Sequence, residues 1–178
     1  MGKLFKEIPA DALVVCAGAY TARFLYQALG VYAPIVPIKS YTFDVPTTTP
    51  FIATHLMCHK SALTAVQLTE GTWRMNLFGD IAGLNFNLDQ RRVRTAKNTV
   101  CITMETKEGL MAKNISAVLR ACSPDDIPVV GPLKTHPNVY VNSGHGARNC
   151  AFSIGSSKIV SEQLAGGQIT TSGSIDPQ

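Results

Sequence analysis

The residues best suited to chemistry lie between Arg120 and Asn149. Arg120 precedes a proline-containing turn, and the glycines Gly144 and Gly146 separate a predicted strand from a predicted helix. A guanidinium group offers paired donors that match a carboxylate. The N–H groups at a helix N-terminus favour an oxyanion or an electron-rich carbonyl. This segment therefore predicts binding of a small carboxylate and of the anionic edge of a cofactor.

Two other kinds of site were weighed for the same segment. The run 144–149 follows a strand like a dinucleotide-binding fingerprint, but its third glycine is replaced by Asn149, and no second strand with an acidic residue follows. Cys150 lies five residues after His145, yet no orienting partner is indicated, which disfavours a cysteine hydrolase. The adjacent pair 125–126 follows a proline and is typical of a turn rather than of paired acid and base groups.

Composition limits the class of protein. The 178 residues are 46% hydrophobic and 16% charged, which suits one domain or two small ones. The net charge of +4 is modest, and its main cluster, within 91–97, is typical of a solvated helix face rather than of nucleic-acid binding. The five cysteines form no C-x-x-C pair, so we expect neither a metal site nor a disulfide framework.

Hydropathy gives an expectation about location. No eighteen consecutive apolar residues occur, and the N-terminus has no apolar run of signal-peptide length. We therefore expect no transmembrane segment and a location in the cytoplasm or an organelle matrix, with peripheral membrane association left open. Residues 168–178 are expected to form a flexible tail.

The first 33 residues predict the end of a doubly wound domain. The apolar run 12–17 has the pattern of a strand buried on both faces of a parallel sheet, and a short helix over 21–29 follows, stopped by Gly30. Because no neighbouring strand of this kind follows closely, we expect this segment to be the end of a doubly wound domain whose earlier strands are absent.

Residues 34–120 predict an antiparallel sheet backed by a helix. Prolines confine the strand over 34–46 to an edge or a bend. Short strands are expected over 51–57, 63–69 and 72–78, the last two joined by a tight hairpin at 70–71. Asp89 then caps a helix that runs to about Glu105, and a strand near 115–119 leads to Arg120.

The last section, residues 121–167, returns to the first domain. It predicts a strand over 139–142, a turn over 143–146, and a helix over 149–164 that ends at two glycines.

Four stretches, in this order and spacing, resemble FAD-dependent amino-acid oxidoreductases of the D-amino-acid oxidase type, and most of all D-amino-acid dehydrogenases. They are 10–20, 34–41, 88–93 and the pair 120–131 with 142–146. The resemblance implies an α+β chain of the α/β family. An antiparallel substrate-binding sheet domain (34–120) would be combined with parts of a Rossmann-like FAD-binding domain (1–33 and 121–167) whose N-terminal half is missing.

The resemblance also implies roles for single residues. Arg120 would bind the α-carboxylate of an amino-acid substrate, and Tyr41 would line the substrate pocket. The residues expected beside FAD are Ala17, Gly18, Ser40, Gly144, His145, Gly146 and Arg148. Arg120 and the helix tip after Gly146 would then face the same flavin ring.

The implied activity is oxidative deamination. A substrate hydride passes to the flavin, and the resulting imino acid is hydrolysed to a keto acid and ammonia without an essential base. Oxygen and a respiratory-chain quinone both remain open as electron acceptors.

Departures from the family pattern are Ser40 in place of a glycine, Asp126 in place of a glycine, and 116–121 in place of a tryptophan-containing segment. The alternative function is a non-catalytic fragment or a partner half of a split flavoenzyme.

Overall fold

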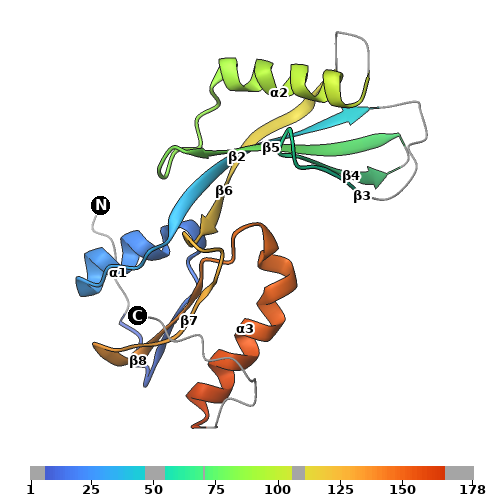
Figure 1. Cartoon of the computed structure of the whole chain (residues 1–178). Helices are drawn as coiled ribbons and strands as arrows, with labels where there is room; N and C mark the ends of the chain where they lie inside the picture. The colour runs from blue at the N-terminus through green and yellow to red at the C-terminus, as the bar shows by residue number, and fades with distance from the viewer. Residues whose placement is uncertain (1–6, 47–54, 70, 106–110, 167–178) are drawn as a thin grey trace. The chain divides into compact units, whose positions relative to one another are not determined.

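The computed structural model describes residues 7–46, 55–69, 71–105 and 111–166. The chain divides into two compact units. Unit 1 consists of Met1–Ile35 with Ala121–Gln178, and unit 2 of Val36–Arg120. Unit 1 thus combines the two ends of the chain, drawn blue and orange in Figure 1.

Unit 2 contains a five-stranded sheet with the strand order β3-β4-β5-β2-β6. Its strands are β2 (Val36–Pro46), β3 (His55–Cys58), β4 (Leu63–Thr69), β5 (Thr72–Ile81) and β6 (Lys113–Cys122). The pairs β2–β5, β3–β4 and β4–β5 are antiparallel, as predicted. Residues 51–54 and 70 of the predicted strands and hairpin lie outside the described residues.

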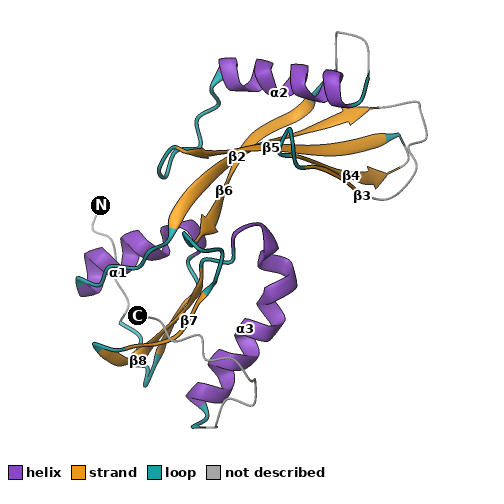
Figure 2. Cartoon of the chain, viewed as in Figure 1, coloured by secondary structure: helices purple, strands orange, loops and turns teal. Residues whose placement is uncertain are grey.

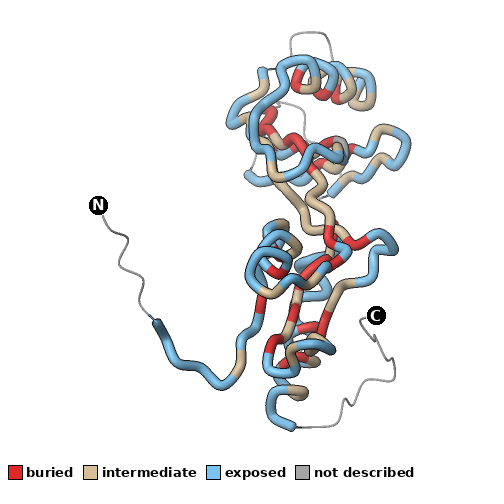
Figure 3. The backbone as a smooth tube through the Cα atoms, turned by 90° about the vertical axis from the view of Figure 1, so that its left-hand side faces the viewer, coloured by how far each residue is buried: buried red, intermediate tan, exposed pale blue. Residues whose placement is uncertain are grey.

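One helix, α2 (Gln90–Thr103), covers one face of this sheet (Figure 2). The predicted cap is confirmed, because the Asp89 carboxylate accepts a hydrogen bond of 2.8 Å from the Arg91 N–H. Val93, Ala96 and Val100 are the buried residues of the helix. In Figure 3 the buried part of the helix is its side toward the sheet.

The core of unit 2 is made by alternate strand residues together with this helix. Odd-numbered positions on the strands β2, β4 and β5 turn inward, because successive side chains of a strand point to opposite faces. Its buried members are Phe43, Val45, Leu63, Ala65, Trp73, Met75, Leu77, Ala96 and Val100. The even-numbered positions of the same strands belong to the opposite face of the sheet.

Strand β2 corrects the expectation of an edge strand. It lies between β5 and β6 in the interior of the sheet. Pro37 and Pro46 fall near its ends, where the missing N–H groups interrupt the ladder least. The predicted bend is present, because the pairing register shifts between Lys39 and Tyr41.

Unit 1 contains a three-stranded mixed sheet with the order β1-β8-β7. β1 (Leu13–Val15) is parallel to β8 (His136–Ser143), which is antiparallel to β7 (Val129–Leu133). The helices α1 (Thr21–Leu29) and α3 (Asn149–Leu164) have the predicted bounds. Gly30 ends α1 with a φ of 68°, and its N–H bonds to the carbonyls of Leu25 and Tyr26.

The prediction that β1 is buried on both faces is wrong for the described chain. Leu13 is 45% exposed and Val14 38% exposed, while Val15 is buried. β1 forms one edge of its sheet and pairs with β8 alone among the described strands, and of its three residues only Val15 packs into a core. The buried core of unit 1 joins Val15 to Leu25, Ala33, Ile35, Val139 and Val141.

Candidate functional site

Arg120 lies near the end of β6 in unit 2 and is half-buried. Its Nη2 donates a hydrogen bond of 3.0 Å to Oδ1 of Asn76 on β5. The sequence analysis predicted a strand only to residue 119; β6 instead continues to Cys122, so Arg120 is held by regular backbone. An amide oxygen thus orients a guanidinium group whose remaining donors suit a carboxylate.

The sheet face that carries Arg120 is polar over three adjacent strands. On β6, Asn114, Ser116 and Val118 share the face of Arg120, because they precede it at intervals of two residues. On the neighbouring strands, Asp44 pairs with Arg74 and Thr42 pairs with Asn76. We call this set of residues on β5, β2 and β6 the polar face.

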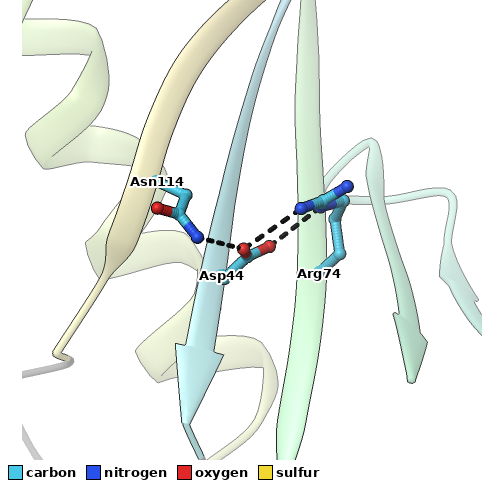
Figure 4. A network of polar contacts seen from close by, with 3 residues as sticks. All are labelled: Asp44, Arg74 and Asn114. Carbon is cyan, nitrogen blue, oxygen red and sulfur yellow. Dashed lines mark hydrogen bonds and ion pairs between the residues drawn. The ribbon is translucent and has the colours of Figure 1, made fainter. Parts of the chain in front are cut away.

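A bidentate ion pair anchors the polar face (Figure 4). Arg74 donates to both carboxylate oxygens of Asp44, over 2.8 and 3.1 Å, and Asn114 Nδ2 adds a bond of 2.8 Å from the other side. The hydrogen bonds from Arg74 and then Asn114 hold the pKa of Asp44 below its usual value. The Asp44 side chain is 7% exposed, whereas that of Arg74 is 49% exposed and presents a guanidinium edge to solvent.

The polar face contains an open cavity of about 410 Å³. Its lining residues are Thr42, Arg74, Asn76, Asn114, Ser116 and Val118. Asn76 both lines this cavity and holds Arg120. Sequence reasoning found Arg120 but missed the lining, although the alternation of polar residues at 74 and 76, and at 114 and 116, was a usable signal.

The segment Lys39–Tyr41 lies deep in unit 2. Ser40 and Tyr41 are 0% and 1% exposed. Tyr41 is paired with Leu77, so it lies on the opposite side of β2 from Thr42. The Lys39 ammonium donates to the Asn87 carbonyl and lies 5.4 Å from the centroid of the Tyr41 ring. The polar cavity is therefore lined by Thr42 and not by Tyr41, whose substrate role stays a prediction, as does the cofactor role of Ser40.

In unit 1, the turn after β1 contains Ala17 and Gly18. Gly18 has a φ of 54°, and a Cβ there would meet no atom within 4 Å, so the turn is open on that side. Ser143, at the end of β8, donates to the Gly18 carbonyl over 3.2 Å and accepts from the Thr21 hydroxyl over 3.0 Å. This buried Ser143 link, which sequence reasoning missed, ties the turn to the residue before Gly144.

The turn Gly144–Gly146 requires its two glycines. Gly144 is buried with a φ of 84°, and a Cβ there would lie 3.4 Å from the backbone nitrogen of Val129. Gly146 has a φ of 58°, and its Cβ would lie 3.5 Å from the sulfur of Cys122. The turn is thus packed against two neighbouring segments of unit 1, which fixes where α3 begins.

His145 is a structural member of this turn. Its Nε2 lies 3.0 Å from Oγ of Ser156 on α3. Since the Ser156 hydroxyl donates to the Ser153 carbonyl, we assign the hydrogen of the neutral ring to Nε2. Burial lowers the pKa of His145, which favours this neutral form.

Arg148 and Asp126 meet beside the start of α3. Arg148 Nη2 lies 3.5 Å from the Asp126 carboxylate, and its guanidinium carbon lies 5.3 Å from the centroid of the Phe152 ring. Asp126 has a φ of 61°, so an aspartate adopts the backbone conformation that the family glycine would supply. At the helix start, the Asn149 side chain accepts from the Cys150 N–H over 2.7 Å.

The predicted site residues thus form two groups. Gly18 and the turn Gly144–Gly146 are connected through Ser143 in unit 1, and Arg120 belongs to the polar face of unit 2. That both groups face one flavin ring stays a prediction. Within the described ranges, no group of three or more His, Cys, Asp or Glu residues could hold a metal ion.

Sequence comparison decides the family. The family described as FAD dependent oxidoreductase (DAO) matches residues 3–163. The chain belongs to this family. It is 29% identical over 164 residues to a D-amino acid dehydrogenase of Granulibacter bethesdensis, covering 90% of this chain and 38% of that protein.

Solved structures of two oxidases have the same fold. Iminodiacetate oxidase from Chelativorans sp. BNC1 superposes with a TM-score of 0.80 at 17% identity, over 96% of this chain and 47% of that one. Glycine oxidase from Geobacillus kaustophilus superposes with a TM-score of 0.79 at 16% identity, over 94% of this chain and 44% of that one. The chain spans less than half the length of these relatives. No helix in the described parts of this DAO-family chain is long and apolar enough to cross a membrane.

Proposed function

We propose that this chain forms the C-terminal part of an FAD-dependent enzyme that deaminates D-amino acids oxidatively. The observation that carries the proposal is Arg120 on the polar face, held by Asn76, in a chain that belongs to a family of FAD-dependent oxidoreductases. The similarity to a D-amino acid dehydrogenase supports the choice of substrate. FAD would serve as the acceptor of the substrate hydride.

Arg120 would bind the substrate α-carboxylate. A guanidinium group can form two parallel hydrogen bonds to a carboxylate, which fixes both position and orientation. Because one Nη2–H is engaged by Asn76, the guanidinium is already oriented before substrate arrives. Such preorganisation lowers the entropic cost of aligning the substrate α-hydrogen for transfer.

The residues of unit 1 suit the flavin. An open glycine turn at the carboxyl end of the parallel strand β1 is a common place for a cofactor. The N-terminus of α3, after the packed Gly144–Gly146 turn, presents a positive dipole end that suits the electron-rich pyrimidine edge. Arg148 would add a positive charge near this edge.

No general base is assigned to the reaction. The Nε2 of His145 is occupied by Ser156, and burial favours the neutral ring. With FAD as hydride acceptor, the substrate ammonium would first lose one proton to water, and water would then hydrolyse the imino acid. The chain would therefore need to orient the substrate and stabilise charge rather than supply a base.

A second candidate is a non-catalytic fragment or one half of a split flavoenzyme. It is favoured by the 38% coverage of the dehydrogenase. In that case a second polypeptide would supply the remaining FAD contacts. The exposed apolar residues Leu13 and Val14 on the edge strand β1 would suit contact with such a partner.

Flavin absorbance separates the two candidates. If the purified chain is yellow and bleaches anaerobically on addition of a D-amino acid, it is an enzyme by itself. If it is colourless after incubation with FAD, the fragment is supported. Arg120→Lys, tested in an enzyme completed with its missing half, should raise the Michaelis constant at least about tenfold, because lysine cannot form the paired bonds. An unchanged Michaelis constant and turnover would remove Arg120 from this role.

A further inference from the structure

The polar face is built to contact something hydrophilic. Its strands alternate strictly between core and open face: Trp73, Met75 and Leu77 pack with α2, while Arg74 and Asn76 turn the other way. A sheet face that only contacts water does not need a fixed arrangement of polar side chains. Here the face holds an ordered set of donors and acceptors joined by hydrogen bonds of 2.8 to 3.0 Å.

Asn76 connects this cavity to the proposed carboxylate site. Its Oδ1 accepts from Arg120, and the same residue lines the cavity with Thr42 and Asn114. A molecule whose carboxylate is bound by Arg120 would therefore place its neighbouring atoms beside Asn76. In an amino acid, those neighbouring atoms include the side chain.

The charges of Asp44 and Arg74 offset each other, and the polar groups that remain are guanidinium N–H donors together with amide and hydroxyl groups that can donate or accept. Asp44 neutralises Arg74, yet the Arg74 side chain remains 49% exposed. Asn76, Asn114, Ser116 and Thr42 add amide and hydroxyl groups, and Val118 is the one apolar residue of the described lining. An apolar substrate side chain would remove water from these groups without replacing its hydrogen bonds, which is unfavourable.

We infer that the polar face binds the side chain of the substrate, and that the preferred substrate is an amino acid whose side chain ends in a carbonyl oxygen, as a carboxamide or a carboxylate. The inference rests on the proposed function, because Arg120 must hold the α-carboxylate. Sites built to hydrogen-bond a substrate group discriminate strongly against analogues that lack it.

Nuclear magnetic resonance of the full ¹⁵N-labelled chain tests this without needing turnover. The signals observed are the side-chain amides of Asn76 and Asn114 and the Nε–H groups of Arg74 and Arg120. D-glutamine, D-glutamate and D-leucine are titrated separately. We expect D-glutamine or D-glutamate to shift the asparagine signals saturably, with a dissociation constant at least about tenfold lower than that of D-leucine.

A matched pair of variants sharpens the test. Thr42→Val removes a hydroxyl from the cavity, and Thr95→Val removes one from the exposed side of α2, where it bonds to the Arg91 carbonyl. We expect Thr42→Val to weaken D-glutamine binding several-fold with D-leucine unaffected, and Thr95→Val to change neither. Equal effects of both variants would contradict the inference.

The failures are distinguishable. If all three amino acids shift Arg120 with equal affinity, the side-chain preference is wrong and the carboxylate role stands. If none of them shifts Arg120, the inference is overturned, while the proposed function is judged separately by Arg120→Lys in the completed enzyme. The comparison of D-glutamine with D-glutamate shows whether the carboxamide or the carboxylate is preferred.

Discussion

Removing the Ser143 hydroxyl should loosen the two turns that we place beside the cofactor. Ser143 is 2% exposed; its hydroxyl oxygen accepts a hydrogen bond from the Thr21 hydroxyl, and its O–H donates to the Gly18 carbonyl. The substitution Ser143→Ala therefore leaves a buried hydroxyl and a backbone carbonyl without this partner. Thr21 itself is fully buried, so water cannot readily replace the lost bond.

The magnitude follows from the two bonds. A buried group left unsatisfied costs about 1–3 kcal/mol, so Ser143→Ala should destabilise unit 1 by roughly 2 kcal/mol. Thr21→Val removes one donor and keeps the bond to Gly18, which should cost about 1 kcal/mol. In the double variant the two side-chain hydroxyls disappear together, so the total should remain near 2 kcal/mol, a coupling of about 1 kcal/mol.

Hydrogen exchange of the Val141 amide measures this effect in unit 1, because Val141 is fully buried in the middle of β8. Exchange that is limited by unfolding of unit 1 should be about 30-fold faster in Ser143→Ala, since each 1.4 kcal/mol is a factor of ten. The native emission of Trp73, in unit 2, serves as a control and should not change. Strictly additive single effects, or a Ser143→Ala cost below about 0.5 kcal/mol, would refute the reasoning.

Three further outcomes are expected. Asp126→Gly should stabilise the chain by up to about 1 kcal/mol in urea unfolding, because glycine adopts a φ of 61° without strain. Any loss of stability would show that the exposed ion pair with Arg148 contributes more than the relief of backbone strain. The folded pKa of His145 is lower than its ordinary pKa of 6.5, so as the pH falls below 6.5 the unfolded chain gains the proton first and the melting temperature should fall. His145→Gln should flatten this dependence of melting temperature on pH. Identical pH profiles for the variant and the wild type would contradict the prediction. Ionised Asp44 should contribute its full share to the stability of the folded chain above pH 3.8, and this share should be lost as the pH falls through its lower folded pKa. Asp44→Asn should therefore be less stable than wild type at pH 7, and the difference in stability should narrow in acid. Unfolding followed by Trp73 fluorescence measures this difference.

Local signals in the sequence were sufficient to predict where the helices begin or end. The Asp89 cap, the Gly30 stop and the bounds Asn149–Leu164 were all predictable, because capping and glycine chemistry act over only a few residues. The strand β4, Leu63–Thr69, was predicted for a similar reason, since turn residues flank it.

The order of the strands in each sheet could not be predicted from local sequence. The prolines of β2 indicated an edge or a bent strand; the bend is present, but the pairing partners that place β2 between β5 and β6 are distant in sequence. Burial of β1 was overpredicted for a related reason, because an apolar run indicates what a strand could pack against and not what is present.

The same difference between local and distant signals decides which residues of the candidate site were predicted. Arg120 and the glycine turns were found from short motifs that resemble the family. Asn76 and Ser143 were missed, since each gains its importance from a partner far away in the chain: Asn76 lies 44 residues from Arg120, and Ser143 lies 122 residues from Thr21.

The ion pair between Asp44 and Arg74 has a consequence for how the sheet assembles. The two residues are directly opposite each other on β2 and β5. A slip of one residue between these strands would turn the Asp44 carboxylate under α2 and expose Phe43 and Val45 to water. The ion pair therefore acts together with the hydrophobic pattern to fix the register between β2 and β5.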